Sequence, residues 1–310
     1  MLVTGGLGFL GRAVTLDLLA AGHRVTVLTR GRPDAVPAGG STAIDGDLRD
    51  PARIRDIVAE GGFDAVVHLA ALIQPRESFA DPLTYYDVNV AGTLNLLRAL
   101  DEARTSVPAP RLVFASTYLV YGTGRVGTLS EDMPPRPESP YAASKICAEQ
   151  VIAAYAATGA IGAVTLRCFN VAGAVDGIAD TDSTRIIPNV FRALTGEQPY
   201  VTLNGDGTTV RDFVHVLDVA EAVRSALTTV TAGEYRVYNV GSGAGTSMAE
   251  IVAAAEAVTG RRVEVRKAPA RPEPPVLTAD TNRIRADLGW RPGRSSLQQI
   301  MGDVWSVWPH

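Results

Sequence analysis

Short apolar runs that alternate with helical stretches are the feature that most constrains how this chain can fold. Apolar runs occupy residues 65–70, 111–116 and 163–167, and helix-forming stretches at 87–100 and 142–158 separate them. Near-continuous apolar runs indicate strands buried on both faces, and parallel strands need such helical crossovers. Right-handed crossovers make a doubly wound sheet. The sequence therefore predicts an α/β fold with a Rossmann-like, doubly wound parallel sheet.

The regular alternation ends at about Gly173, after which glycine, proline and aspartate become frequent and the elements shorten. The chain has 310 residues, and a typical domain has about half that length. We therefore expect a first unit of residues 1–170 and a smaller mixed α/β unit of residues 171–310. Two proline-containing stretches, residues 133–137 and 269–275, are predicted to be rigid loops near a site.

Composition argues against several classes of partner. The net charge is −4 and the isoelectric point is near 5.6, whereas proteins that bind nucleic acid or anionic membranes are usually basic. Cys147 and Cys168 form neither a disulfide framework nor a zinc motif, and the four histidines lack metal-ligand spacing. The sequence shows neither a secretory signal nor an apolar run of about 18 residues. We expect a cytoplasmic protein without a metal.

A glycine-rich turn follows the first apolar residues of the chain. Gly5, Gly8 and Gly11 are spaced three residues apart, with Phe9 and Leu10 between the last two, and residues 12–21 are helix-forming. Glycines let a backbone approach a pyrophosphate, whose charge is met by the helix N-terminus. A purely structural tight turn would also use glycine, but the strand–turn–helix context favours a dinucleotide site.

The residues expected at the adenosine end of that site leave the choice of nucleotide open. The second predicted strand ends at Thr29, where an NAD site usually has Asp or Glu, and it is followed by Arg30 and Arg32. Two arginines there would suit a 2′-phosphate, or they form a solvated turn. Asp47, which precedes Leu48 after the third predicted strand, would accept from an adenine amino group or is a plain loop aspartate.

A tyrosine–lysine motif, with hydroxyl residues upstream, provides the candidate catalytic groups. Tyr141 and Lys145 are four residues apart in a predicted helix and therefore share one face, and Ser116 and Thr117 lie at a strand end upstream. A lysine ammonium close to a phenol lowers the phenol pKa from about 10, which makes it a usable acid or base near neutral pH. The hydroxyl of Thr117 would orient a substrate alcohol. The predicted catalytic residues are Thr117, Tyr141 and Lys145.

Together, these motifs resemble the extended short-chain dehydrogenase/reductases of the NAD-dependent nucleotide-sugar epimerase/dehydratase family, and most closely its UDP-galactose (UDP-glucose) 4-epimerases. The resemblance covers essentially the whole chain. Beyond the glycine turn and the Tyr141/Lys145 pair, it rests on His68-Leu69-Ala70-Ala71, Asn89-Val90, Val120-Tyr121-Gly122, Arg167-Cys168-Phe169-Asn170, Arg211 to Asp218, Tyr238 to Gly243 and Leu288-Gly289-Trp290.

The resemblance implies a 4-epimerase with bound NAD. Tyr141 would take the proton of the sugar's C4 hydroxyl while a hydride leaves C4, and the flat 4-keto sugar would turn before the hydride returns to its other face. Thr117 would support the hydroxyl, and Lys145 would hold the nicotinamide ribose. Residues 1–170 would form the NAD(P)-binding domain, to which segments near 211–241 return, and residues 171–310 the nucleotide-sugar-binding domain. A homodimer through helices 87–100 and 142–158 is implied as well.

The resemblance also implies two sets of binding residues. The cofactor would contact Gly5, Gly8, Phe9, Leu10, Gly11, Thr29, Arg30, Asp47, Leu48, Leu69, Ala70, Ala71, Asn89, Ser116, Tyr141 and Lys145. The UDP-sugar would contact Arg76, Thr117, Tyr141, Phe169, Asn170, Arg185, Arg192, Asn204, Arg211 and Arg271. Asn204 replaces the family's aromatic residue before Gly-Asp-Gly, so the contact to the base is expected to differ.

Departures from the family pattern narrow the activity. Related dehydratases place Asp-Glu directly after the catalytic threonine, whereas this chain has Tyr118 and Leu119 there, so we exclude a dehydratase. The sugar is either a UDP-hexose or a UDP-hexuronic acid, because Arg76, Arg185 and Arg192 either hold a C6 carboxylate or are solvated.

Two other functions stay open on the sequence alone. Thr29 followed by Arg30 also fits an NADPH-dependent reductase of a nucleotide-linked 4-ketosugar. The second possibility is an inert nucleotide-binding regulator, against which the intact set of Thr117, Tyr141 and Lys145 argues.

Overall fold

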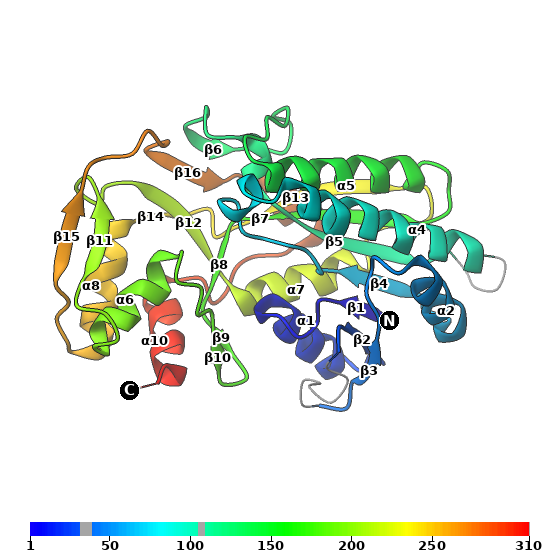
Figure 1. Cartoon of the computed structure of the whole chain (residues 1–310), viewed down its shortest axis with the longest axis horizontal. Helices are drawn as coiled ribbons and strands as arrows, with labels where there is room; N and C mark the ends of the chain where they lie inside the picture. Colours follow the sequence, from blue (N-terminus) through cyan, green and yellow to red (C-terminus); the bar gives the residue numbers. More distant parts are fainter. Residues whose placement is uncertain (32–38, 105–108, 310) are drawn as a thin grey trace.

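The computed structural model of the chain describes residues 1–31, 39–104 and 109–309. Two sheets lie beside each other along the long axis of the molecule (Figure 1). The first has seven strands and is covered by helices on both faces. The second belongs to a smaller mixed region at the left of Figure 1, to which most of the chain after β7 contributes.

The first sheet is parallel throughout and has the strand order β13-β7-β5-β4-β1-β2-β3. This is the doubly wound order, which reverses direction between β1 and β4. The predicted fold class is therefore confirmed. The strands are β1 (Leu2–Thr4), β2 (Thr26–Thr29), β3 (Thr42–Asp45), β4 (Ala65–His68), β5 (Arg111–Thr117), β7 (Gly162–Cys168) and β13 (Tyr235–Val240).

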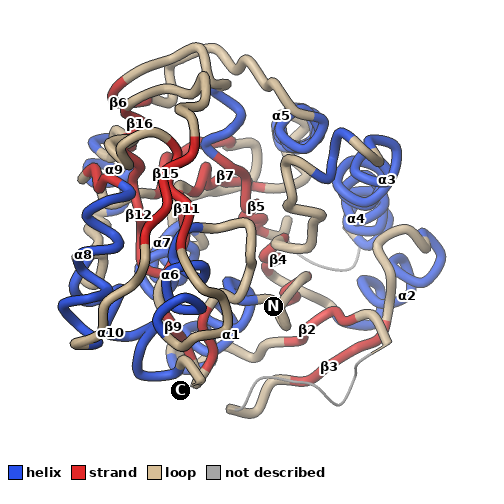
Figure 2. The backbone as a smooth tube through the Cα atoms, turned by 60° about the vertical axis from the view of Figure 1, so that its left-hand side comes forward, coloured by secondary structure: helices blue, strands red, loops and turns tan. Residues whose placement is uncertain are grey.

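Two hydrophobic cores explain why the strands are apolar at nearly every position. Val3 and Val67 pack into a core with α1 (Phe9–Ala20) and α7 (Val216–Ala226). Their neighbours Leu2 and Val66 point to the other face. That face is covered by α2 (Pro51–Gly61), α4 (Gly92–Ala103) and α5 (Pro140–Ala156). Figure 2 shows these three helices and α3 (Pro82–Tyr86) gathered on one side of the sheet.

The second region combines a mixed sheet with two short strand pairs. Its sheet has the order β14-β12-β16-β6, with β8 paired to β12, and separate pairs join β9 to β10 and β11 to β15. Its core contains Phe191, Ile251 and Trp308. The strands are β6 (Gly127–Leu129), β8 (Asn170–Ala172), β9 (Ala174–Val175), β10 (Ile178–Ala179), β11 (Val201–Asn204), β12 (Val210–His215), β14 (Gly245–Ser247), β15 (Val265–Ala268) and β16 (Val276–Ala279). The helices are α6 (Ile186–Leu194), α8 (Met248–Thr259) and α10 (Leu297–Val307), whereas α9 (Asn282–Leu288) packs against β13 of the first sheet.

Two predicted helices have different bounds in the structure. The stretch predicted at 87–100 begins earlier, as α3, passes through one π-helical turn (Asp87–Ala91) and continues as α4. The stretch predicted at 142–158 begins at Pro140, because Ser139 caps it by accepting from the backbone N–H of Ala142. Short 3₁₀ turns at Glu77–Phe79 and Tyr118–Tyr121 belong to the connections that follow β4 and β5. Within the described residues, we find no helix long and apolar enough to cross a membrane.

Candidate active site

A cavity of about 1250 Å³ lies at the carboxyl edge of the first sheet, between that sheet and the second region. In doubly wound folds this edge, at the point where the strand order reverses, is where ligands bind. Here the reversal places the loops after β1 and β4 side by side. Both loops line the cavity, with Gly5, Gly8, Phe9, Leu10 and Gly11 from the first and Leu69, Ala70 and Ala71 from the second.

The glycine turn is shaped to leave room for a ligand backbone. Gly5 has a φ of 72°, and a Cβ there would lie 2.7 Å from the backbone nitrogen of Ala70. A Cβ on Gly11 would lie 2.0 Å from the carbonyl oxygen of Gly5. At Gly8, by contrast, the nearest atom to a Cβ is that same oxygen at 3.4 Å, so a side chain there would enter the cavity. Among the described residues, no side chain caps the first turn of α1. The loop therefore fits a dinucleotide pyrophosphate at a helix N-terminus.

The four residues predicted for the adenosine end do not line the cavity. Thr29 is buried at the end of β2, and Leu48 is part of the core. The carboxylate of Asp47 lies 2.7 Å from Nη2 of Arg49 and 3.9 Å from Nη1 of Arg30. Hydrogen bonds from Arg49 hold the pKa of Asp47 below its ordinary value. Arg30 is thus beside a carboxylate at this edge, and Arg32 lies outside the described residues.

Thr117, Tyr141 and Lys145 come together on the wall of the cavity. Thr117 is the last residue of β5, and Tyr141 and Lys145 lie on the first two turns of α5. The side chain of Thr117 interacts with the phenol of Tyr141. The ammonium of Lys145 donates to the carbonyl of Ala115 at 2.8 Å and lies 4.6 Å from the ring centroid of Phe114. One strand and one helix thus bring a hydroxyl pair and a buried amine together.

Burial dominates the electrostatics of this group. It raises the pKa of Tyr141, while the interaction with Thr117 and the charge of Arg185 oppose that rise. Burial also lowers the pKa of Lys145 from 10.5 to about 8. The sequence predicted that Lys145 would lower the phenol pKa, but in this structure burial raises it, and Lys145 is not among the main groups that act on it. Both groups are therefore held closer to their neutral forms.

A buried polar network links the strand and the helix that carry the catalytic residues. Ser116 donates to Oε1 of Glu149 at 2.5 Å, and Arg167 donates to the other oxygen of Glu149 at 2.7 Å. Arg167 also donates to Tyr121, whose hydroxyl donates to Asn239. Ser116 lines the cavity, but its hydroxyl hydrogen is used here. Glu149 was not predicted as a site residue, although its spacing of four residues from Lys145 places both on one helix face.

Asn89, predicted to bind the cofactor, forms its hydrogen bonds with other residues of the protein instead. Its side chain accepts from the backbone N–H of Leu72 at 2.8 Å and donates to the carbonyl of Leu72 and to Oγ of Ser144. The residue is buried and does not line the cavity. Asn89 therefore ties the loop after β4 to α5, which carries Tyr141.

The opposite wall carries most of the residues predicted for the UDP-sugar. Phe169, Asn170, Asn204, Arg211 and Arg271 all line the cavity. So does Glu273, which lies 2.7 Å from Nη2 of Arg211. The proline-containing loop 269–275 thus borders the cavity, as predicted. None of residues 133–137 does so.

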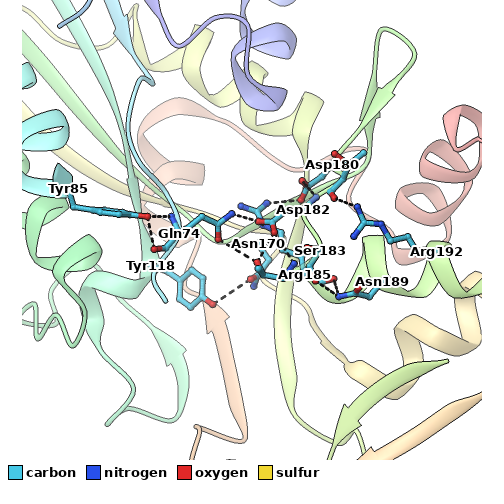
Figure 3. Close-up of polar contacts among 12 residues, drawn as sticks. Gln74, Tyr85, Tyr118, Asn170, Asp180, Asp182, Ser183, Arg185, Asn189 and Arg192 are labelled. Atoms are coloured by element: carbon cyan, nitrogen blue, oxygen red, sulfur yellow. Dashed lines mark hydrogen bonds and ion pairs between the residues drawn. The ribbon is translucent and has the colours of Figure 1, made fainter. Parts of the chain in front are cut away.

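The three arginines considered for a C6 carboxylate have different surroundings. Arg185 lines the cavity and forms ion pairs with Asp180 at 2.9 Å and Asp182 at 3.3 Å, as Figure 3 shows. Arg192 does not line the cavity; it donates to the carbonyl of Thr181 and lies 3.6 Å from Glu197. Arg76 lines the cavity, is exposed, and forms no ion pair with a described residue.

The cavity also contains residues that were not predicted to bind, among them Tyr118 and Gln74. Tyr118 stacks on Phe169 with ring centroids 4.9 Å apart, and its hydroxyl is 3.4 Å from Oδ1 of Asn170. Gln74, in the loop beyond β4, donates to Asp182 at 2.6 Å. Figure 3 shows both pointing toward the same centre as Arg185. Neither has a sequence signal beyond its position in the loop that follows a strand.

Comparison with known proteins agrees with this geometry. Residues 1–241 match the model of the NAD dependent epimerase/dehydratase family. The UDP-glucose 4-epimerase of Corynebacterium glutamicum is 37% identical over 318 residues, which cover 99% of this chain and 94% of that protein. Among solved structures, the UDP-glucose-4-epimerase of Stenotrophomonas maltophila with bound NAD and formylated UDP-arabinopyranose has a TM-score of 0.90 at 32% identity, covering 99% of this chain and 96% of that one.

A second solved structure bears on whether the sugar is a hexose or a hexuronic acid. MoeE5 in complex with UDP-glucuronic acid and NAD has a TM-score of 0.84 at 34% identity, covering 97% of this chain and 96% of that one. The same protein was also solved in complex with UDP-glucose and NAD.

The chain belongs to the NAD-dependent epimerase/dehydratase family. It is an isomerase, and its cofactor is NAD. The open turn at Gly8 leaves room for the pyrophosphate of that cofactor, and Tyr141 and Lys145 line the same cavity.

Proposed function

We propose that this UDP-sugar 4-epimerase interconverts UDP-glucose and UDP-galactose. The observation that carries the proposal is the position of Tyr141. Its phenol interacts with Thr117 and lies on a cavity that is shared by the glycine turn and by Arg185, Arg211 and Arg271. The names of the relatives, UDP-glucose 4-epimerases that align over nearly the whole chain, support the same activity.

The two ends of the cavity suit two parts of the substrate. Arg211, Arg271 and Asn170 lie on the wall opposite the glycine turn. The planar fork of an arginine binds a diphosphate through paired hydrogen bonds. Because Arg211 is paired with Glu273, a bound diphosphate would compete for the same guanidinium. The hexose would then lie between this wall and Tyr141, with its C4 hydroxyl toward Thr117.

The chemistry of this chain's own residues is proton transfer at the O4 oxygen. When bound, NAD supplies a reversible hydride acceptor. The phenol oxygen of Tyr141 would take the proton of the C4 hydroxyl as the C4–H bond breaks, and would return it when the bond is remade on the other face. A positioned acid or base of this kind contributes about 10²–10⁴-fold to a rate. Thr117 would hold O4, and Lys145 would fix the cofactor ribose beside the phenol.

A homodimer is part of the proposal. Phe79, Leu83 and Tyr86 are exposed on the segment formed by η1 (Glu77–Phe79) and α3. α3 packs against α5, so these side chains extend the outer face of the helices through which the family resemblance implies a dimer. Exposed apolar groups gathered in this way commonly mark an interface. Light scattering of the purified protein should give twice the monomer mass, and Leu83→Glu should give the monomer mass.

One experiment separates the epimerase from the reductase. The purified protein is incubated with UDP-galactose without added cofactor, and the nucleotide sugars are separated by chromatography. We expect UDP-glucose to accumulate until the two sugars reach equilibrium, with NAD released when the protein is denatured. Tyr141→Phe protein prepared in parallel is the control. Dependence on added NADPH, with net consumption of a 4-ketosugar, would contradict the proposal.

A further inference from the structure

Arg185 is one of the charged residues that line the cavity. It is the N-cap residue of α6 and has extended backbone angles, φ −101° and ψ 149°. Its side chain is partly exposed and lines the cavity together with Tyr118 and Tyr141. Its charge acts on the phenols of both tyrosines. Arg185 therefore lies in the compartment where the hexose must sit if Tyr141 is to reach it.

Two carboxylates already surround this guanidinium. Nη1 of Arg185 lies 2.9 Å from Oδ2 of Asp180, and its Nε lies 3.3 Å from Oδ2 of Asp182. The three side chains together carry one net negative charge. Asp182 and Asp180 line the same cavity as Arg185. The subsite therefore presents a compensated arginine rather than a free cation.

Asp182 is fixed as a carboxylate by several donors. Its Oδ1 accepts from the backbone N–H of Thr184 at 2.9 Å and from the hydroxyl of Thr184 at 2.7 Å. Its Oδ2 accepts from Nε2 of Gln74 at 2.6 Å. Burial raises the pKa of Asp182, but these hydrogen bonds and the charge of Arg185 bring it below its ordinary value. Asp180 is held in turn, because it accepts from the backbone N–H of Asp182 at 3.1 Å.

We propose that Asp180 and Asp182 are specificity-determining residues, which compensate the charge of Arg185 so that the site accepts a hexose with an uncharged C6 group and rejects a UDP-hexuronate. The proposal rests on the proposed 4-epimerase function and specifies its substrate class. A C6 carboxylate near Arg185 would meet two like charges at close range, whereas a hydroxymethyl group would meet three groups able to hydrogen-bond it. MoeE5 was solved with both UDP-glucose and UDP-glucuronic acid, so both kinds of sugar nucleotide bind to a protein of this fold.

Arg76 is the other candidate for binding a C6 carboxylate, because it lines the cavity and has no ion pair with a described residue. It is exposed, however, and water screens an exposed charge strongly. Its position at the start of the turn after the β4 loop places it at the rim. If Arg76 instead bound a C6 carboxylate, wild-type protein would use UDP-glucuronate and Arg76→Gln would lose that use.

The test compares the two sugar nucleotides in the NAD-loaded protein. kcat/KM for C4 epimerisation of UDP-glucose and of UDP-glucuronate is measured for wild type, Asp180→Asn, Asp182→Asn and the double variant. Asparagine keeps the size and the hydrogen-bonding oxygen but removes the charge. Asp56→Asn, which removes an exposed partner of Arg55 on α2, is the matched control. The Kd of each sugar nucleotide is measured in parallel in the Tyr141→Phe background, where turnover is suppressed.

We expect wild type to prefer UDP-glucose, and the preference to fall by about tenfold for each carboxylate removed, which is the scale of one like charge at close range in a partly hydrated site. Adding Arg185→Gln to the double variant should abolish the gained binding of UDP-glucuronate, and Asp56→Asn should change nothing. Asp180→Asn leaves the contacts of Asp182 with Gln74 and Thr184 in place, so it tests the idea even if the double variant folds poorly.

Two results would overturn the inference. One is wild-type protein that binds or epimerises UDP-glucuronate as well as UDP-glucose. The other is a folded Asp180→Asn protein whose ratio of Kd values equals that of wild type. The failure of the proposed function looks different: neither sugar is epimerised by wild type, while the ratio of Kd values still reports on the carboxylates.

Discussion

Glu149 on α5 and Arg167 on β7 form a buried ion pair, with Oε2 and Nη2 2.7 Å apart and side chains that are 5% and 6% exposed. The pair joins the helix that carries Tyr141 and Lys145 to β7, which lies between β5 and the edge strand β13 in the first sheet. Because Ser116 also donates to Glu149, the pair fixes the strand end that carries Thr117. The relative positions of the catalytic hydroxyl groups thus depend on one buried carboxylate.

Glu149→Ala should be among the most destabilising single changes in the chain. It leaves the guanidinium of Arg167 buried without its partner, and breaking a buried pair from one side costs about 3–5 kcal/mol. Urea denaturation would measure the loss. Replacing both residues with apolar ones of similar size, Glu149→Leu with Arg167→Met, should recover a large part of it. A single variant as stable as wild type would show that the pair is not structurally important.

Gly11→Ala should abolish retention of NAD. The new Cβ would lie 2.0 Å from the carbonyl oxygen of Gly5, so the turn must move away from the position that leaves room for a pyrophosphate. Overpacking of this kind also costs about 1–3 kcal/mol of stability. Gly302→Ala is the matched control, because Gly302 is inside α10 and a Cβ there would have no described neighbour within 4 Å. There we expect unchanged binding and a gain of up to about 1 kcal/mol. NAD binding by fluorescence and melting temperature measure both.

Tyr141→Phe should lower kcat by at least about 10²-fold, since it removes the only atom of that side chain able to take a proton. The binding of NAD and of UDP should change little, because the ring and its edge-on contact with Tyr85 remain. Steady-state kinetics and calorimetry would separate the two effects. Turnover near the wild-type level would refute the assigned role.

Lys145 should make stability depend on pH in a defined window. Its pKa is lowered by burial from 10.5 to about 8. Between these two values the unfolded chain binds a proton that the folded chain does not, so stability rises with pH there, by up to about 3 kcal/mol in total. Below pH 8 the ammonium is charged in both states and this contribution is constant.

The comparison variant is Lys145→Met, which lacks the titrating group. Urea denaturation at several pH values from about 7 to about 10.5 should show the variant's advantage over wild type shrinking as the pH rises. Parallel pH profiles for the two proteins would mean that the amine does not titrate differently on folding.

Tyr118 offers a test of how tightly the sugar is held. Tyr118→Phe keeps the stack on Phe169 and loses only the 3.4 Å contact with Asn170, so we expect a change in KM of less than about threefold. Tyr118→Ala removes the ring, and the loss of an aromatic contact and the space left behind should raise KM by about tenfold. Equal effects of both variants would assign the contribution to the hydroxyl instead.

The parts that sequence predicted best are those fixed by regular geometry. Alternating apolar runs and helices specify a parallel sheet, and parallel strands end at one edge, so Thr117 and the glycine turn had to meet there. The spacing of Tyr141 and Lys145 fixes a shared helix face. These local rules do not depend on the rest of the chain, and the structure agrees with them.

The parts that sequence missed depend on contacts between distant segments. Gln74 and Asp182 are separated by 108 residues along the chain, and no periodicity links them. The pairing of Arg185 with Asp180 and Asp182 is local in sequence, but charged residues in a loop are normally solvated. That these three residues line the cavity is visible only in the folded structure. The pKa of Tyr141 was predicted from one neighbour, whereas burial by the whole fold dominates it.

The last strand of the first sheet, β13, consists of residues that the chain reaches only after it has passed through β8 to β12 of the second region. Until then, the edge of β7 has no partner on that side. During synthesis, the N-terminal half therefore cannot close its own sheet as it leaves the ribosome. An unpaired edge of a buried, apolar strand is a site for wrong association between chains. The two regions must therefore complete their folding together. A fragment ending at residue 170 would expose the edge of β7 permanently.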